Sequence, residues 1–291
     1  MTRNLILAAA MSAVAFASLA ARAAESGPCA VPAAGVPISA PLAHVAARID
    51  KGEPLNIVAV GSSSTSGIGA SSPELNYPSR LEVDLREIFP KLEIHVVNRG
   101  KGGEDAPEEL ARLAGDVVAL HPDLAIWQVG TNAVLRRDDL AADGEWMREG
   151  VDLLKRSGID VVLMDLQYAP RVLERSAYAT MEELIADTAS RAHVGLFRRF
   201  ALMRYWQSSH APSAPAMVGA DGLHMTDAGY ECLATDLAAA LGTNWRFQAK
   251  FALRAQGATA SVAALPAQPG SAPRVARAPA DMRRNDATPF N

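Results

Sequence analysis

The sequence is poor in cysteine, in aromatic residues and in charge of one sign. Of its 291 residues two are Cys and 5% are aromatic, and 28 basic against 32 acidic side chains give a formal net charge of −4. A nucleic-acid-binding protein normally carries a basic surface interleaved with stacking aromatic rings, so this composition argues against that class. No CxxC pair, no HExxH motif and no Cys/His cluster at zinc spacing is present, and we therefore expect no bound metal.

Long apolar runs are also scarce, except near the N-terminus. Residues 5–20 form a short, Ala-rich apolar stretch that follows Arg3 and precedes an A-x-A motif at 21–23. This order is typical of a cleaved export signal. The alternative is a membrane anchor, but the stretch is short and weakly apolar for a span of about 20 residues. We expect residues 1–23 to be a signal peptide, and the mature chain to be periplasmic or secreted with no integral membrane span.

The C-terminal segment differs from the rest of the chain in composition. Residues 248–291 are rich in Ala, Pro and Arg and show no sustained apolar period. Such a segment buries too little apolar surface to offset its ordering entropy, so we expect it to be disordered. Its basic residues either stay solvated, which the sequence favours, or contact acidic cell-envelope polymers. We expect residues 24–49 to be an N-terminal leader and 50–247 to be one domain.

Within 50–247, short apolar runs alternate with helical patterns. Strands are expected at 55–60, 92–97, 123–129, 159–164 and, more weakly, 194–197. Helices are expected at 78–89, 107–120, 138–156, 176–192, 198–208 and 226–241. Uniformly apolar strands that alternate with helices favour a parallel sheet covered on both faces. The expected fold class is therefore α/β.

Polar clusters follow the expected strands. The first strand runs into a Gly/Ser-rich turn at 61–67, the second into 98–104, and the third into Gly-Thr-Asn at 130–132. A fourth cluster, Asp-Gly-Leu-His at 221–224, precedes the last helix. Each cluster alone is typical of an ordinary turn. Because open parallel sheets bind ligands at the carboxyl ends of their strands, the shared placement predicts one site.

The clusters contain the groups that hydroxyl-based catalysis needs. A serine is almost fully protonated at neutral pH and therefore needs a neighbouring base. His224 can be that base, and Asp221, three residues earlier, can orient its ring. A backbone N–H at Gly103 and the side-chain amide of Asn132 can stabilise an oxyanion. Among the other histidines, His210 is the one serious rival because it lies in a predicted loop.

In this combination and order, the clusters resemble the sequence blocks of the SGNH, or GDSL-like, hydrolase superfamily. The resemblance spans roughly residues 57–240 and is specific as a set, although each block alone is weak. It implies a three-layer α/β/α sandwich with a five-stranded, flavodoxin-like parallel sheet. It also implies hydrolysis of acyl esters without a cofactor.

The resemblance assigns a role to each candidate residue. It implies Ser63 as the nucleophile, with His224 and Asp221 as the other members of a catalytic triad. It implies Ser63, Gly103 and Asn132 as the oxyanion hole, in which Gly103 contributes its backbone N–H and Asn132 its side chain.

Two positions depart from the family pattern. Ser62 stands where an aspartate usually precedes the nucleophile, and Ala133 stands where an aspartate usually follows Asn132. Neither position belongs to the catalytic set, so we expect the chemistry to survive. The first departure leaves Ser62, Ser63 and Ser64 as neighbouring candidate nucleophiles, of which the family pattern selects Ser63.

Together these features predict an exported serine esterase acting on short-chain acyl esters, such as acetyl esters, of cell-envelope or extracellular carbohydrate. Two alternatives remain open: an acyltransferase that uses the same residues on glycans, and a non-catalytic carbohydrate-binding protein of the same fold. A nucleotide cofactor is not expected, because neither a phosphate-binding loop nor a complete dinucleotide fingerprint is present. The sequence makes no prediction of the oligomeric state.

Cys29 and Cys232 allow two interpretations. Export would place both in an oxidising compartment, where they can form a bridge that joins the N-terminal segment to the last helix. Alternatively, Cys232 is a small buried helix residue and Cys29 lies unpaired in the leader. Both interpretations remain open at this point.

Overall fold

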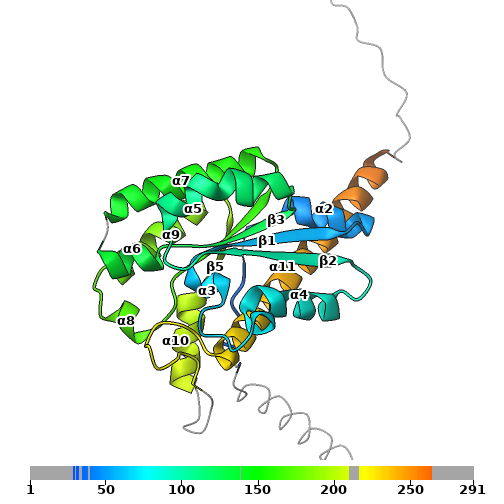
Figure 1. The fold of residues 1–291 in the computed structure, drawn as a ribbon. Helices are drawn as coiled ribbons and strands as arrows, with labels where there is room; N and C mark the ends of the chain where they lie inside the picture. The colour runs from blue at the N-terminus through cyan, green and yellow to red at the C-terminus, as the bar shows by residue number, and fades with distance from the viewer. Residues whose placement is uncertain are drawn as a thin grey trace, which may run out of the picture. The chain divides into compact units, whose positions relative to one another are not determined.

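The computed structural model describes Cys29 and residues 31–32, 35–38, 40–137, 139–209 and 216–263, with side chains up to residue 246. In this part of the chain five strands form one parallel sheet in the order β2-β1-β3-β4-β5 (Figure 1). The strands are β1 (Leu55–Gly61), β2 (Ile94–Gly100), β3 (Leu124–Gln128), β4 (Asp160–Met164) and β5 (Gly195–Phe197). The predicted five-stranded parallel sheet is confirmed.

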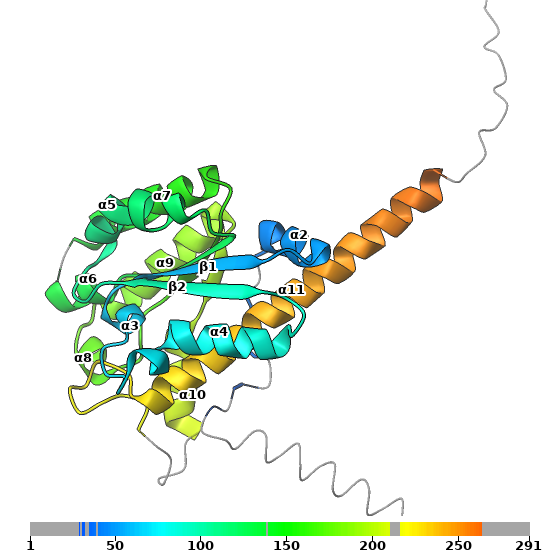
Figure 2. The same ribbon diagram turned by 45° about the vertical axis from the view of Figure 1, so that its right-hand side comes forward.

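Helices connect these strands and cover both faces of the sheet. They are α2 (Ala43–Lys51), α3 (Ser63–Ser66), α4 (Tyr77–Ile88), α5 (Ala106–Asp116), α6 (Thr131–Arg136), α7 (Leu140–Arg156), α8 (Pro170–Leu173), α9 (Tyr178–Ala192), α10 (Arg199–Ser209) and α11 (Asp227–Ala263), with 3-10 turns at Pro73–Leu75 and Val118–Leu120. Helices α5, α7 and α9 lie on one face, whereas α4 and the first turns of α11 lie on the other (Figures 1 and 2). The result is three layers, as the family resemblance implies.

Side chains that point to alternate faces of the strands contribute to an apolar core on each side of the sheet. In β1, Ile57 and Ala59 pack into the core under α4 and α11, whereas Val58 and Val60 pack into the core under α5 and α7. All four side chains are at most 1% exposed. Because successive side chains of a strand point to opposite faces, a continuous apolar run is what a strand buried on both faces requires.

Two predicted boundaries differ from the structure. The expected leader 24–49 contains the start of α2, and its Leu42 and Val45 are buried in the core that also holds Leu55. The expected tail at 248–291 begins inside α11, which continues to Ala263, since the Ala-rich sequence there has high helix propensity. The predicted signal peptide and the rest of the tail lie outside the described residues.

A disulfide joins Cys29 to Cys232, with their Cα atoms 4.8 Å apart. It connects the segment before α2 to the second turn of α11, so the first of the two interpretations of these cysteines is correct. No helix among the described residues is long and apolar enough to cross a membrane.

Candidate active site

Ser63 lies in a sharp turn at the carboxyl end of β1. The strand ends at Gly61, and Ser63 is the first residue of the short helix α3. Gly61 has φ of 154°, and a Cβ at this position would lie 2.5 Å from Thr65 Oγ1 and 2.7 Å from the Gln128 carbonyl oxygen. Only glycine therefore fits where the strand turns into the helix, and this turn leaves Ser63 at the edge of the sheet.

Ser63, His224 and Asp221 form a chain of hydrogen bonds. His224 Nε2 lies 3.0 Å from Ser63 Oγ, and His224 Nδ1 lies 2.5 Å from Asp221 Oδ2. A neutral ring with its proton on Nδ1 donates to Asp221 and presents Nε2 as the acceptor for the serine hydroxyl. The three predicted triad residues are thus placed so that His224 can remove the serine proton.

Asp221 is held in its ionised form. Its Oδ1 accepts the backbone N–H groups of Leu223 and His224, each at 3.0 Å. Partial burial raises the pKa of Asp221, but the hydrogen bonds from the Leu223 N–H and from the ring and N–H of His224 outweigh it and lower this pKa to about 2. The carboxylate is therefore negative at neutral pH and can stabilise an imidazolium ring.

The loop that carries His224 packs directly against the loop that follows Ser63. A Cβ on Gly69, whose φ is 98°, would lie 2.3 Å from the Met225 carbonyl oxygen and 3.1 Å from His224 Cβ. Nearby, the Tyr230 hydroxyl donates to the Ile68 carbonyl oxygen at 2.7 Å. This close approach fixes His224 beside Ser63 although the two residues are 161 positions apart in the sequence.

The three consecutive serines bond to different partners. Ser62 Oγ donates to Gln128 Oε1 at 3.0 Å, whereas Ser64 Oγ donates to Gln167 Oε1 at 3.4 Å. Of the three hydroxyls, only that of Ser63 contacts His224. The geometry thus favours the serine that the family pattern selects.

The predicted oxyanion donors lie on two neighbouring loops. Asn132, in the first turn of α6, donates from Nδ2 to the Glu104 carbonyl oxygen at 2.7 Å. Gly102 lies next to Ser63, since a Cβ on Gly102 would be 3.9 Å from Ser63 Cβ. Beside it, Gly103 is exposed and has nothing within 4 Å of its Cβ position. The roles of Gly103 and Asn132 as donors stay predictions.

Two other histidines bond to carboxylates away from Ser63. His44 contacts Asp123 Oδ1 through Nε2 at 2.9 Å, and His95 contacts Glu93 Oε1 through Nε2 at 2.9 Å. His210, the rival of His224, lies outside the described residues. Among the described side chains, no group of three or more His, Cys, Asp or Glu could hold a metal ion.

The sequence did not point to Gln128, although this residue bonds to both sides of the turn that carries Ser63. Gln128 is fully buried at the end of β3, and its Oε1 accepts from Ser62 N at 3.1 Å, Ser62 Oγ at 3.0 Å and Thr65 Oγ1 at 3.3 Å. The hydroxyl of Ser62, where the family pattern has an aspartate, is thereby satisfied. The sequence signal that could have identified Gln128 is its position, since it is an amide at the end of an otherwise apolar strand.

A second buried amide, Gln167, follows β4 and bonds to the same region. Its Oε1 accepts from Thr131 Oγ1 and from Arg199 Nη2, each at 2.9 Å, besides Ser64 Oγ. Arg199 is fully buried, and its Nε also donates to the Asp165 carbonyl oxygen at 2.9 Å. This network connects the turn of Ser64 to the first residue of α6, which directly precedes Asn132.

Comparison with known proteins agrees with this fold. The model of the non-GDSL lipase-like family matches residues 28–246. The fold is similar to a catalytic mutant of an acetylxylan esterase from Geobacillus stearothermophilus, with 22% identity, a TM-score of 0.56 and coverage of 66% of this chain and 95% of that one. No curated protein matches the sequence.

Two further solved structures have the same fold. One is a two-domain esterase active on acetylated mannans, with 20% identity, a TM-score of 0.58 and coverage of 73% of this chain and 56% of that one. The other is a lipase/acylhydrolase from Enterococcus faecalis, with 21% identity, a TM-score of 0.55 and coverage of 65% and 96%. The chain therefore belongs to the non-GDSL lipase-like family and has the SGNH, or GDSL-like, hydrolase fold that its sequence blocks predict.

Proposed function

We propose that the protein is a serine esterase that hydrolyses carboxylic esters. The observation that carries this proposal is the hydrogen-bond chain from Ser63 Oγ through the His224 ring to Asp221, at 3.0 and 2.5 Å. These hydrogen bonds lie at the carboxyl ends of parallel strands, where folds of this class hold their active sites. The ionised state of Asp221 suits a carboxylate that stabilises a protonated histidine.

Ester hydrolysis at this site proceeds in two halves. In the first, Ser63 Oγ attacks the ester carbonyl carbon while His224 Nε2 takes the serine proton, and the carbonyl oxygen becomes an oxyanion. The N–H groups of Ser63 and Gly103 and the amide of Asn132 are the donors for this oxyanion. His224 then protonates the leaving alkoxide, which departs as the alcohol and leaves Ser63 acylated.

The second half removes the acyl group. His224 takes a proton from water as the water attacks the acyl carbonyl carbon, and the same donors stabilise the second oxyanion. Collapse of this intermediate breaks the bond to Ser63 Oγ, which regains the proton from His224. The products are one alcohol and one carboxylic acid, and no metal or redox cofactor takes part. Activity is therefore expected to withstand EDTA.

The substrate that we favour is a short-chain acyl ester, such as an acetyl ester, of a cell-envelope or extracellular carbohydrate. In support, structures with the same fold include esterases of acetylated xylan and acetylated mannans. Ile68 is 48% exposed and lies 3.1 Å from the Cβ position of Gly102, so it offers apolar surface for an acyl group beside Ser63. Rates on p-nitrophenyl esters from acetate to palmitate, and on acetylated xylan and glucans, test this substrate class.

We further propose that the protein is exported and acts in the periplasm or outside the cell. The charged, apolar and small residues of positions 1–23 support an export signal. The Cys29–Cys232 disulfide supports an oxidising compartment. The N-terminal sequence of the protein recovered from the periplasm or the medium tests this proposal: a start near residue 24 is expected, and recovery of the full-length chain from the cytoplasm would contradict it.

The esterase proposal is tested on the three neighbouring serines. Ser63→Ala is expected to lower kcat on p-nitrophenyl acetate by several orders of magnitude, because the attacking hydroxyl is lost. Ser62→Ala and Ser64→Ala are matched controls that remove a hydroxyl from the same turn, and each is expected to cost about 1 kcal/mol of stability through one lost hydrogen bond. Circular dichroism verifies the fold of each variant. Wild-type kcat in a folded Ser63→Ala variant would contradict the proposal.

A further inference from the structure

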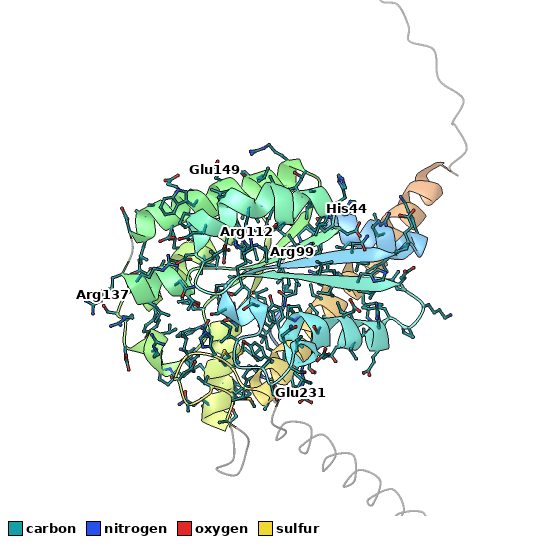
Figure 3. All side chains as sticks on the ribbon, viewed as in Figure 1. His44, Arg99, Arg112, Arg137, Glu149 and Glu231 are labelled. Atoms are coloured by element: carbon teal, nitrogen blue, oxygen red, sulfur yellow. A yellow bond between two sulfur atoms is a disulfide. The ribbon has the colours of Figure 1, made fainter. Side chains whose placement is uncertain are left out.

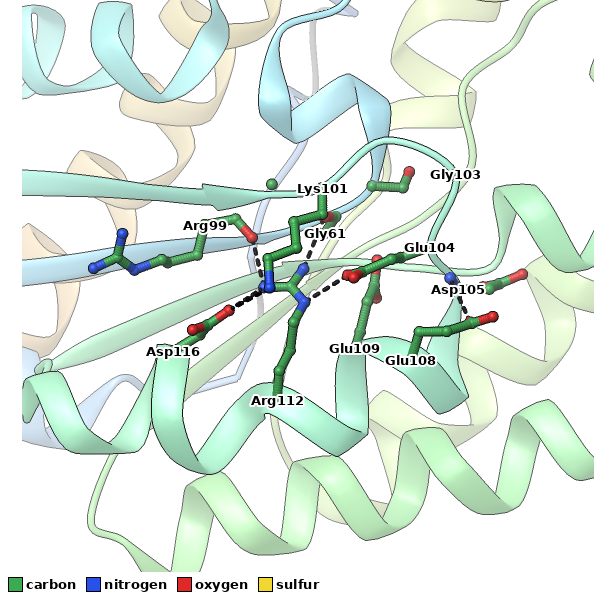
Figure 4. Close-up of polar contacts among 12 residues, drawn as sticks. Gly61, Arg99, Lys101, Gly103, Glu104, Asp105, Glu108, Glu109, Arg112 and Asp116 are labelled. Atoms are coloured by element: carbon green, nitrogen blue, oxygen red, sulfur yellow. Dashed lines mark hydrogen bonds and ion pairs between the residues drawn. The ribbon is translucent and has the colours of Figure 1, made fainter.

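One arginine of α5 connects the ends of the two strands that lead into the site. Arg112 Nη2 donates to the carbonyl oxygen of Gly61 at 3.2 Å, and Arg112 Nη1 donates to the carbonyl oxygen of Arg99 at 2.8 Å (Figure 4). Gly61 ends β1 just before the turn that carries Ser63, and Arg99 is the penultimate residue of β2. A single guanidinium therefore binds the ends of both strands.

The same guanidinium binds the loop 101–105, which follows β2. Arg112 Nε donates to Glu104 Oε2 at 2.5 Å (Figure 4). The Glu104 carbonyl oxygen in turn accepts the amide of Asn132 at 2.7 Å. At the start of this loop, Lys101 N donates to the Gly61 carbonyl oxygen at 2.9 Å. Two hydrogen bonds thus lead from Arg112 through Glu104 to the amide of Asn132.

Burial makes this connection stronger than an ordinary surface ion pair. The side chain of Arg112 is 10% exposed and that of Glu104 is 22% exposed. Hydrogen bonds between ionised groups are about twice as strong as neutral ones, and limited contact with water preserves their strength. Asp116, one turn along α5, also accepts from Arg112 Nη1 at 3.0 Å and completes the set of partners.

We propose that Arg112 is a positioning residue for ester hydrolysis, acting through Glu104 on the amide of Asn132. The inference rests on the proposed esterase function. An oxyanion donor acts only when it lies about 2.7 to 3.1 Å from the developing charge, and a displacement of about 1 Å can lower the rate about 100-fold. Loss of Arg112 therefore lowers kcat more than it changes KM, because the amide acts on the transition state.

The test compares variants of this path with an arginine outside it. Arg112→Ala is expected to lower kcat about 10- to 100-fold on p-nitrophenyl acetate, with KM changed less than about threefold. Arg112→Lys should restore part of the loss, and Glu104→Gln, which keeps the backbone carbonyl, should lower kcat about 3- to 10-fold. Arg191→Ala is the control, since Arg191 pairs with Asp187 on the exposed face of α9, and it should keep the wild-type kcat.

The decisive measurement repeats these substitutions in the Asn132→Ala background. Because the proposed effect passes through the Asn132 amide, Arg112→Ala and Glu104→Gln should each lower kcat less than about threefold there. An equal fold loss in both backgrounds, as a general loss of structure would give, overturns the positioning role. Wild-type kcat in folded Arg112→Ala and Glu104→Gln variants also overturns it. If Arg112→Ala does not fold, Arg112→Lys and Glu104→Gln give the answer.

Ser63→Ala, run in the same assay, separates the two proposals. Wild-type kcat in Ser63→Ala overturns the esterase proposal itself. An inactive Ser63→Ala together with unchanged kcat in the Arg112 and Glu104 variants overturns the positioning role alone.

Discussion

Two histidine–aspartate pairs lie at opposite ends of the same parallel strands. His224 contacts Asp221 at the carboxyl ends. His44, which Figure 3 labels on α2, contacts Asp123 at the amino ends. The distances are similar, 2.5 Å and 2.9 Å. The ring nitrogens differ: His224 uses Nδ1 for its aspartate and leaves Nε2 for Ser63 Oγ, whereas His44 bonds its aspartate through Nε2.

The two aspartates also have different surroundings. Asp221 accepts hydrogen bonds from residues of its own loop, so both of its oxygens serve to orient His224. Asp123 accepts the N–H of Asn56 at 2.8 Å and lies 3.3 Å from Arg48 Nε, so it joins α2 to the starts of the strands. A histidine–carboxylate contact is therefore not by itself a sign of catalysis. A free ring nitrogen that faces a hydroxyl at the carboxyl ends of the strands is the distinguishing feature.

Removal of each histidine tests this distinction most strongly. His224→Ala is expected to lower kcat about 10⁴-fold or more, because Ser63 loses its base. His44→Ala is the matched control: it should keep the wild-type kcat and lower the free energy of unfolding by about 1 kcal/mol or less, as one half-exposed hydrogen bond is lost. Kinetics on p-nitrophenyl acetate and urea unfolding measure the two effects. Equal losses of activity in both variants would remove the distinction between the pairs.

The Cys29–Cys232 disulfide connects the segment before α2, which carries His44, to the start of α11, which follows the loop of His224. Cys29 precedes the helix of His44, and Cys232 follows the loop of His224. Replacing both cysteines by serine is expected to lower the free energy of unfolding by about 2 to 5 kcal/mol, because the unfolded chain gains freedom. The kcat of the folded variant should stay near that of the wild type.

Intact mass after alkylation verifies that Cys29 and Cys232 are bridged in the wild-type protein. No alkyl label is expected before reduction of the unfolded chain, and two are expected after it. Two labels without reductant would contradict the bridge, and unchanged unfolding in urea would contradict its contribution to stability.

Substitution of Asn132 tests the site at the carboxyl ends of the strands through a smaller expected loss of kcat. Asn132→Ala is expected to lower kcat about 10²- to 10³-fold, since one donor to the oxyanion is lost. Asn132→Asp keeps the shape of the side chain but has no N–H to donate, and it should lose at least as much. Steady-state kinetics with verified circular dichroism measures both variants. A folded Asn132→Asp with wild-type kcat would rule out this role.

Buried carboxyl groups predict a pH effect on stability opposite to that of Asp221. Burial raises the pKa of Glu109 to about 8, although Trp127 Nε1 donates to it at 2.6 Å. An unfolded glutamate loses its proton near pH 4.3, so the folded chain binds more protons between about pH 4.3 and 8. Through Glu109, stability therefore falls as pH rises across this window. The lowered pKa of Asp221 instead contributes stability above about pH 4, which is lost as pH falls toward 2.

Glu109→Gln isolates this effect, because glutamine still accepts from Trp127 but does not titrate. Urea unfolding at pH 5 and pH 8 is expected to show a smaller loss of stability in the variant than in the wild type. Part of the slope should remain, since burial also raises the pKa of Asp105 to about 7. Equal slopes in the two proteins would show that Glu109 is ionised in the folded state.

Much of the fold could be predicted because β1, β3 and β4 are buried almost throughout. The run that marked the edge strand β2 is interrupted by Glu93 and His95, and its predicted bounds of 92–97 end before the observed Gly100. The three-residue strand β5 lies within the predicted 194–197. The helices α6 and α8 were missed, since six and four residues are too few to show an apolar period. Helix α2 was missed because it lies in an Ala- and Pro-rich segment without a clear start signal.

The site was predictable only where it resembles known sequence blocks. Ser63, Asp221 and His224 lie in such blocks, and the structure brings them together. The contacts from Gln128 to Ser62 and from Gln167 to Ser64 span 66 and 103 residues. The local sequence does not predict these long-range hydrogen bonds, because they form only when the ends of the strands come together in the fold. The same holds for Arg112, whose partner Gly61 is 51 residues away.

The separation of 161 positions between Ser63 and His224 has a consequence for the newly synthesised chain. The polypeptide is synthesised N-terminus first, so the proposed nucleophile, Ser63, is present well before the proposed base, His224. Under the proposed mechanism, a partly synthesised chain therefore holds Ser63 without the base that would activate it. If the proposed mechanism is correct, hydrolysis can begin only when the segment after β5 has folded back onto the carboxyl end of β1.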